Sequence, residues 1–460
     1  MADKPVVLLL NPPGDKLYIR DYYCSFSSKA DYFWPPQDLI YLSGILDGVF
    51  DVRVLDAITA KLSPEDCFRE ILRLSPAAVV WTTGTATFKS DAAFLDRCKT
   101  ARPELRSVAS AGILKFVGRE ILESQPGIDA LLLDFGESDL IPYLKGAPGP
   151  WKSLLARVDG RLVGSDAPVA RIFEVPVPRH DLFDFKKYKL PIAKRFPFTV
   201  VVTSLGCPYR CGFCTAGAFG YRLRPVENVI EELKLLTRLG VREILFQDPT
   251  FTVDTRRVTE LCRRMVEERF DFTWSANADL HALDEEKLRQ MKEAGCHTLS
   301  VGIESGDDGM LKKYSKMITT AEIRDKTALI NRNKIKVLGY FILGLPGETR
   351  ASAEATIGLA KSLKLDLASF AVATPDIGTR LRAEAIEKGW VSSDLLTWDS
   401  SASAILETGG LSQKEIWDLR TKAVHAFYLR PSYLLRKLLG VRSLRDFRGL
   451  VSNAFSLLGK

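Results

Sequence analysis

The stretch Gly206-Cys207-Pro208-Tyr209-Arg210-Cys211-Gly212-Phe213-Cys214 is the most informative part of the sequence. It holds three of the chain's eight cysteines, spaced Cys-x3-Cys-x2-Cys, whereas the other five are scattered singly. Disulfides explain such a cluster poorly in a long chain whose thiols stay reduced, so a metal site is predicted. Three thiolates in a tight loop can each bind one iron of a cubane and leave the fourth iron open. We therefore expect Cys207, Cys211 and Cys214 to hold a [4Fe-4S] cluster.

A structural zinc site is the main alternative for these cysteines. Such a site is closed by four ligands. No histidine lies nearer in sequence than His180, and the remaining cysteines are dispersed, so a fourth ligand is not evident. The four histidines, at positions 180, 281, 297 and 425, show no ligand spacing, and we assign them no role.

The cysteine loop follows the first of six strand-like segments that alternate with helical patterns. Buried apolar strands separated by amphipathic helices indicate a parallel sheet. Six βα units in about two hundred residues fit a (βα)6 partial TIM barrel better than the full eight-unit barrel. We place this domain at residues 196–400, with strands at Val200–Ser204, Glu243–Phe246, Phe272–Ser275, Thr298–Ile303, Lys336–Leu343 and Leu367–Ala373.

Residues 1–150 show the same alternation and predict a flavodoxin-like, doubly wound α/β sheet. Residues 151–195 contain many prolines and glycines and predict a linker with little regular structure. Residues 401–460 predict a small helical, basic region. The expected strands of the first domain are Val6–Leu10, Val52–Leu55, Ala77–Trp81, Ser107–Ala111 and Ala130–Leu133, and its helices lie around Asp38–Leu46, Pro64–Leu74, Lys89–Thr100 and Gly118–Ser124.

Composition predicts a globular protein of the cytoplasm, with 46% hydrophobic and 26% charged residues. No apolar run approaches the ~20 residues that span a bilayer, and the chain opens without a signal peptide. Residues 421–460 carry eight basic residues against one acidic residue, a surplus equal to the net charge of +7 for the whole chain. The rest is balanced, so nucleic-acid binding is not indicated.

The cysteine spacing, the aromatic Phe213 before the last cysteine and the position of the loop after a barrel strand resemble the radical S-adenosylmethionine (SAM) superfamily. The resemblance implies that SAM chelates the open iron and that the reduced cluster cleaves it to a 5'-deoxyadenosyl radical. A reducing partner such as flavodoxin or ferredoxin is implied as well. Segments ending the second to fifth barrel strands are similar to the family's SAM-binding elements, which implies SAM contacts from Phe213, Gln247, Asp248, Ser275, Asn277, Glu304, Ser305, Ile342 and Gly344.

A flavodoxin-like sheet ahead of such a barrel resembles the cobalamin-binding class of the superfamily. No histidine precedes His180, so the first domain offers no imidazole for the lower face of cobalt. This fits the class B radical SAM methylases, and it also fits a corrinoid-free domain kept as a scaffold. The resemblance implies cobalamin contacts at the carboxyl ends of the strands, from Asn11, Pro12, Thr83, Thr85, Gly112, Ile113, Gly136 and Glu137.

These expectations lead to one preferred function and two alternatives. The preferred function is a cobalamin-dependent C-methyltransferase that uses a 5'-deoxyadenosyl radical and methylcobalamin on an unactivated carbon. The alternatives are an enzyme with the same cofactors that catalyses cyclisation, rearrangement or oxidation, and a non-catalytic iron–sulfur or corrinoid carrier. No catalytic side chain is assigned.

The basic C-terminal region bears on the partners of the protein. From Phe427 on, apolar residues interleave with Arg and Lys, which is typical of a helix that lies on an anionic membrane or recognises an acidic partner. A helical cap with a solvated basic face explains the pattern equally well. The resemblance favours an organic substrate that is hydrophobic, such as a lipid or tetrapyrrole.

Overall fold

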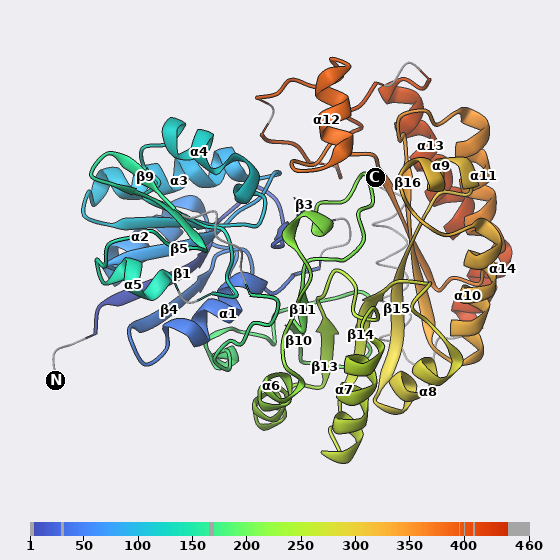
Figure 1. The fold of residues 1–460 in the computed structure, drawn as a ribbon, viewed down its shortest axis with the longest axis horizontal. Coiled ribbons are helices and arrows are strands. Elements are labelled where there is room, and N and C mark those ends of the chain that lie inside the picture. The colour runs from blue at the N-terminus through green and yellow to red at the C-terminus, as the bar shows by residue number, and fades with distance from the viewer. Residues whose placement is uncertain are drawn as a thin grey trace.

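Two mainly parallel sheets lie side by side, and C-terminal helices cover the outer side of the second sheet (Figure 1). The computed structural model describes residues 4–28, 32–137, 139–164, 170–394, 396–399, 401–407 and 410–439.

The first sheet has the strand order β4-β1-β5-β6-β7-β8-β9, and its first five strands pair in parallel. Helices cover both faces, so β1 and β5 are almost fully buried, mainly apolar runs, and β6 is buried from Ser107 on. The predicted doubly wound sheet is confirmed. The strands are β1 (Val6–Asn11), β4 (Asp51–Asp56), β5 (Ala78–Thr82), β6 (Arg106–Ser110) and β7 (Ala130–Leu132), and the helices are α1 (Gln37–Leu46), α2 (Pro64–Leu74), α3 (Phe88–Ala101), α4 (Leu114–Ser124) and α5 (Leu140–Leu144).

A hairpin extends this sheet beyond the predicted end of the first domain. β8 (Leu154–Val158) pairs antiparallel with β7, and β9 (Arg161–Val163) pairs with β8. The prediction of little regular structure was therefore wrong for this part of residues 151–195. The turn is Asp159-Gly160, with φ of +48° and +74°. Asp-Gly is a preferred two-residue hairpin turn, because its left-handed backbone matches the twist of the flanking strands.

The second sheet has six parallel strands in the order β10-β13-β14-β15-β16-β17, which confirms the partial barrel. Its apolar side chains form one core with the surrounding helices. The strands are β10 (Phe198–Val201), β13 (Glu243–Phe246), β14 (Thr273–Ala278), β15 (Cys296–Glu304), β16 (Lys336–Leu343) and β17 (Leu367–Val372). The helices are α6 (Val226–Arg238), α7 (Thr255–Glu267), α8 (Glu285–Glu293), α9 (Asp308–Lys313), α10 (Thr320–Arg332), α11 (Arg350–Ser362) and α12 (Arg380–Glu387).

Two further helices follow, α13 (Gln413–Tyr428) and α14 (Pro431–Leu439), as the sequence predicts for this region. A capping box between Ser412 and Glu415 starts α13, which packs its apolar face into the barrel core. Residues 440–460, the rest of the predicted basic region, lie outside the described residues. Within the described ranges, every helix is too short or too polar to cross a bilayer.

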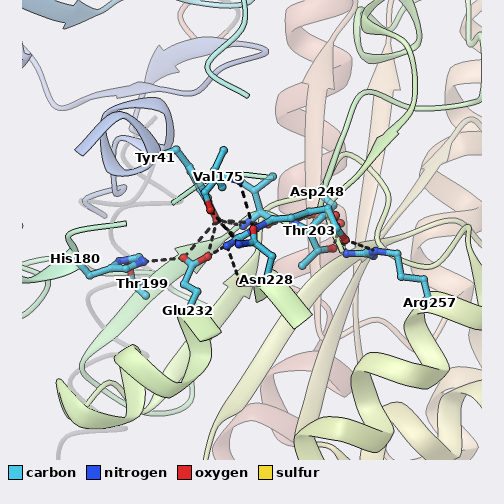
Figure 2. A network of polar contacts seen from close by, with 11 residues as sticks. Tyr41, Val175, His180, Thr199, Thr203, Asn228, Glu232, Asp248 and Arg257 are labelled. Atoms are coloured by element: carbon cyan, nitrogen blue, oxygen red, sulfur yellow. Dashed lines mark hydrogen bonds and ion pairs between the residues drawn. The ribbon is translucent and has the colours of Figure 1, made fainter. Parts of the chain in front are cut away.

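A buried polar network joins the two sheets (Figure 2). Tyr41 of α1 accepts a hydrogen bond from the backbone N of Val202, 2.6 Å away, and lies beside the Glu232 carboxylate of α6. Glu232 pairs with Arg224 and lies 2.7 Å from His180 Nε2. Burial alone would raise the pKa of Glu232, but Arg224 and His180 lower it, so the group is held as a carboxylate. The network fixes α1 against the first barrel strand.

Candidate active site

The cysteine loop leaves the carboxyl end of β10 through a short hairpin, β11 (Ser204–Leu205) with β12 (Arg222–Leu223). Gly206, directly before Cys207, has φ +67°, and a Cβ there would clash with the Gly220 carbonyl oxygen. Only glycine suits this position. The N–H of Gly206 donates to the Tyr23 hydroxyl at 2.7 Å, so a residue from the first domain supports the start of the loop.

The three cysteines are free thiols near one another. Burial raises the pKa of Cys207 to about 11 and that of Cys214 to about 12, and it raises the pKa of Cys211 as well. Among the described residues, no three His, Cys, Asp or Glu side chains converge as ligands of a single ion would. A cubane does not require such convergence, because each thiolate binds its own iron. The loop therefore fits the predicted cluster in its donor atoms and in its position.

Glu304 ends β15 beside this loop. It has φ +65°, follows a register shift at Gly302, and is only 8% exposed. Burial raises the pKa of Glu304, and the ammonium of Lys316, 3.5 Å from its carboxylate, opposes that rise. Burial disfavours the charge on Lys316. Glu304, Cys211, Asp279 and Cys214 outweigh burial and raise the pKa of Lys316.

The sequence did not predict Lys316 as a site residue, because a lysine that follows a short helix has the same signal as an ordinary surface lysine. The structure places its ammonium within electrostatic range of both the ribose-binding candidate Glu304 and the cluster thiols. A partly buried cation at this position can bind the carboxylate of a ligand that reaches from the cluster to Glu304.

The two residues predicted at the end of the second barrel strand form bonds within the protein. The Asp248 carboxylate is fully buried and accepts from Thr203 N at 2.6 Å, from the Thr203 hydroxyl and from the Ser204 hydroxyl. Its oxygens already bind the segment that leads into the cysteine loop, and contact between Asp248 and SAM stays a prediction. Gln247 donates to Asp21 of the first domain at 2.7 Å, and its side-chain oxygen has no partner among the described residues.

The other SAM candidates divide into polar and apolar groups. The buried Ser275 hydroxyl has no partner among the described residues, whereas Asn277 donates to the Asp248 carbonyl at 2.8 Å and Ser305 contacts Thr356. Gly344 has φ +85°, and its N–H donates to Glu348. Phe213 and Ile342 pack on the same small apolar cluster, which offers a wall for a flat ring.

The chain itself occupies much of the carboxyl edge of the first sheet. Arg20, in a hairpin of β2 (Tyr18–Arg20) and β3 (Ser25–Ser27), is fully buried, pairs with Asp91, and donates to the Asn11 side chain and the Pro12 carbonyl. Sequence reasoning missed this covering segment. Further internal bonds join Thr83 to Asp91, Gly112 N to Tyr22 O, Gly136 N to Asp134, and Glu137 to Arg222.

Thr85 and Ile113, among the predicted cobalamin residues, line a narrow apolar pocket with Thr83. Phe88 also lines it, together with Ile377 and Leu396 from beyond the last barrel strand. Its volume is about 10 Å³. The chemistry of the walls suits a flat aromatic base, but such a base fits only if the side chains move apart.

The carboxyl edges of the two sheets thus meet. Asp21 bonds to Gln247, Trp398 N donates to the Thr85 carbonyl, and Ile377 reaches the pocket of the first sheet. Cys24, one of the five cysteines scattered singly in the sequence, is exposed here within electrostatic range of Cys214. Ligands at the two edges would therefore share one space.

Known proteins are similar to this chain in sequence and in fold. Residues 201–360 match the radical SAM superfamily. The chain is 32% identical over 433 residues to an uncharacterized methyltransferase of Pyrococcus horikoshii, covering 91% of this chain and 93% of that protein. The chain belongs to the radical SAM superfamily.

Two further matches cover both domains. The anaerobic magnesium-protoporphyrin IX monomethyl ester cyclase of Rubrivivax gelatinosus is 26% identical to this radical SAM protein, over 78% of this chain and 68% of the cyclase. The structure of Kitasatospora setae TsrM, a radical SAM methyltransferase with cobalamin and a [4Fe-4S] cluster bound, matches with a TM-score of 0.67 at 17% identity, over 93% of this chain and 92% of that one. This likeness confirms the predicted two-domain fold.

Proposed function

We propose that this radical SAM protein is a cobalamin-dependent methyltransferase that acts on an unactivated carbon of an organic substrate. The observation that carries the proposal is the meeting of the two carboxyl edges, joined by Asp21–Gln247 and Trp398–Thr85. A methyl carrier at one edge and a radical source at the other would reach the same substrate carbon. The Pyrococcus relative, itself named a methyltransferase, supports this reading.

In this proposal the residues of the barrel hold the cluster and SAM. Cys207, Cys211 and Cys214 ligate the cluster, which supplies the electron that breaks SAM. Glu304 accepts hydrogen bonds from the ribose hydroxyls, and the Lys316 ammonium pairs with the carboxylate of SAM. Phe213 and Ile342 face the adenine, while Gln247 and Ser275 contribute the polar atoms that lack partners in the protein. An external reductant such as flavodoxin or ferredoxin completes the electron supply.

The pocket lined by Thr85 and Ile113 would take the aromatic base of cobalamin, which supplies the transferable methyl group when bound. The first sheet contributes no histidine, so cobalamin should bind without an imidazole from this domain. Electron paramagnetic resonance of the protein loaded with Co(II) cobalamin tests this point. A nitrogen hyperfine triplet from a protein ligand would contradict it, and failure to bind any corrinoid would favour the scaffold alternative.

The test of methyl transfer uses the full chain, reconstituted anaerobically with iron, sulfide and cobalamin. SAM deuterated in its methyl group is supplied with candidate hydrophobic substrates and a reductant. A product heavier by the deuterated methyl group, formed together with 5'-deoxyadenosine, supports the proposal. A carrier would release no 5'-deoxyadenosine.

Cyclisation or oxidation without methyl transfer is the second candidate. It is favoured by the cyclase of Rubrivivax gelatinosus, whose match spans 78% of this chain. The same experiment separates the two, because a cyclase would form 5'-deoxyadenosine and a product without deuterium from SAM. A location in the cytoplasm and peripheral contact with a membrane through the basic C-terminal residues also stay predictions.

A further inference from the structure

Helix α14 presents leucines to solvent. The exposed fractions are 43% for Leu434, 60% for Leu435 and 78% for Leu439. Among the described residues twelve large apolar side chains are exposed, and four of them lie between Leu429 and Leu439. Single exposed apolar residues are ordinary, but a group of them marks a surface that binds something.

The two arginines of this segment are turned towards the barrel. Tyr433 is buried, and Arg430 and Arg436 lie over its ring. Arg430 donates to the Lys361 carbonyl, and Arg436 to the Leu365 carbonyl. The helix therefore uses its cations to dock onto the barrel and leaves its apolar face outside. This is the reverse of an ordinary surface helix.

A basic groove lies beside α14, between α10 and the turn after α11. Its volume is about 420 Å³, and Arg324, Arg332 and Lys364 contribute cations to a lining without a carboxylate. Arg324 bonds to the Ser362 hydroxyl. Across the described ranges, neither Arg332 nor Lys364 forms an ion pair, so both charges are available to a ligand.

One segment of chain, residues 361–365, both lines the groove and holds α14. Leu363 and Lys364 line the groove, while the carbonyls of Lys361 and Leu365, on either side of them, hold α14. The groove and α14 therefore adjoin on one side of the barrel. That side is the outer side of the barrel, away from the first sheet (Figure 1).

We propose that α14 and the groove between α10 and α11 form a docking surface for an anionic lipid bilayer. The leucines enter the acyl boundary, and Arg332 and Lys364 bind lipid phosphates. An acidic protein would satisfy the cations but not the exposed leucines, so the combination favours lipid. The sequence after α14 contains four basic residues and one acidic residue, so its net charge is positive as well. The proposal does not depend on the reaction catalysed.

Sedimentation with vesicles tests the surface with the full chain. The protein is mixed with vesicles of phosphatidylcholine alone, or of phosphatidylcholine with phosphatidylglycerol, at low and high ionic strength. It should sediment with the anionic vesicles only, and less at high salt. Replacing Leu434, Leu435 and Leu439 together with Ser should weaken binding by roughly tenfold or more, because binding scales with buried apolar area.

The control replaces three exposed apolar residues elsewhere, Leu72, Val266 and Ile386, with Ser, and it should bind like the wild type. Arg332→Glu with Lys364→Glu should remove the preference for anionic vesicles. The proposal is overturned if the wild type ignores anionic vesicles, if the leucine variant binds as well as the control, or if soluble polyglutamate binds as tightly as vesicles. Formation of 5'-deoxyadenosine should not change in any variant, which separates this outcome from failure of the proposed reaction.

Discussion

Tyr23→Phe should loosen the cysteine loop from a position outside the barrel. The Tyr23 hydroxyl accepts the N–H of Gly206 at 2.7 Å, one residue before Cys207. Phenylalanine keeps the edge-on packing against Phe219, whose ring centroid is 5.2 Å away, and removes only the hydroxyl. The Gly206 N–H is then left without its acceptor.

The expected size of the effect follows from that loss. An unpaired backbone donor away from water costs about 1–3 kcal/mol, and the partial exposure of Tyr23 places the value near the lower end. A change of about 1–2 kcal/mol makes local opening roughly 5- to 30-fold more frequent. Gly206 cannot relax freely, since the next backbone N–H, that of Cys207, donates to the Ala216 carbonyl at 3.1 Å.

Hydrogen exchange measured by mass spectrometry on peptides spanning residues 206–214 checks this prediction. Tyr22→Phe is the matched control, because the neighbouring Tyr22 also packs on Phe219 but its hydroxyl donates to Leu133 O in the first domain. The control should leave exchange in the cysteine loop unchanged. Equal acceleration by both variants, or none by Tyr23→Phe, would refute the reasoning.

Three further predictions concern the site and one buried carboxyl. Replacing Cys207, Cys211 and Cys214 together with Ala should abolish the charge-transfer absorption of the reconstituted cluster, with an unchanged circular dichroism spectrum as control. Glu304→Ala should weaken SAM binding by roughly tenfold, as expected for a buried bond to a charged group, while iron content stays the same, and calorimetry checks the affinity. Burial raises the pKa of Asp38 to about 6, so the folded protein binds a proton at Asp38 more tightly than the unfolded chain does. The folded protein therefore loses stability as the pH rises from about 4 to about 6. Asp38→Asn should therefore gain in Tm relative to wild type across that range, and parallel Tm curves for the two proteins would contradict this.

The strands and helices of both sheets follow from the sequence because their signals are local. Apolar runs separated by amphipathic stretches specify buried parallel strands wherever helices cover both faces. The hairpin of β8 and β9 had a local signal too, in Asp159-Gly160, but the surrounding prolines and glycines masked it. A search for Asp-Gly between short apolar runs would have found it.

The roles of single polar residues were harder to predict, because they depend on partners far away in the chain. Asp248 ends a strand as a ligand-binding residue would, yet Thr203 and Ser204, more than forty residues earlier, occupy its oxygens. Arg20 bonds to Asp91, seventy-one residues later, and so covers part of the carboxyl edge of the first sheet, where the sequence predicted a ligand. No rule of residue spacing predicts such distant pairs. The cysteine motif could therefore be recognised in the sequence, whereas the polar contacts around it could not.

The shared core of the two domains bears on how substrate reaches the site. One apolar cluster contains Leu42 of α1, Phe135 beyond β7, and Phe198 and Val200 of β10. Separating the sheets would expose this core and break the buried Tyr41–Glu232 contact, so a hinge between them is disfavoured. The two carboxyl edges therefore keep a fixed spacing, and the choice of substrate rests on the side chains between them rather than on domain closure. Cys24 and Tyr340, which lie within electrostatic range of each other and keep exposed side chains, are the first positions at which to alter that choice.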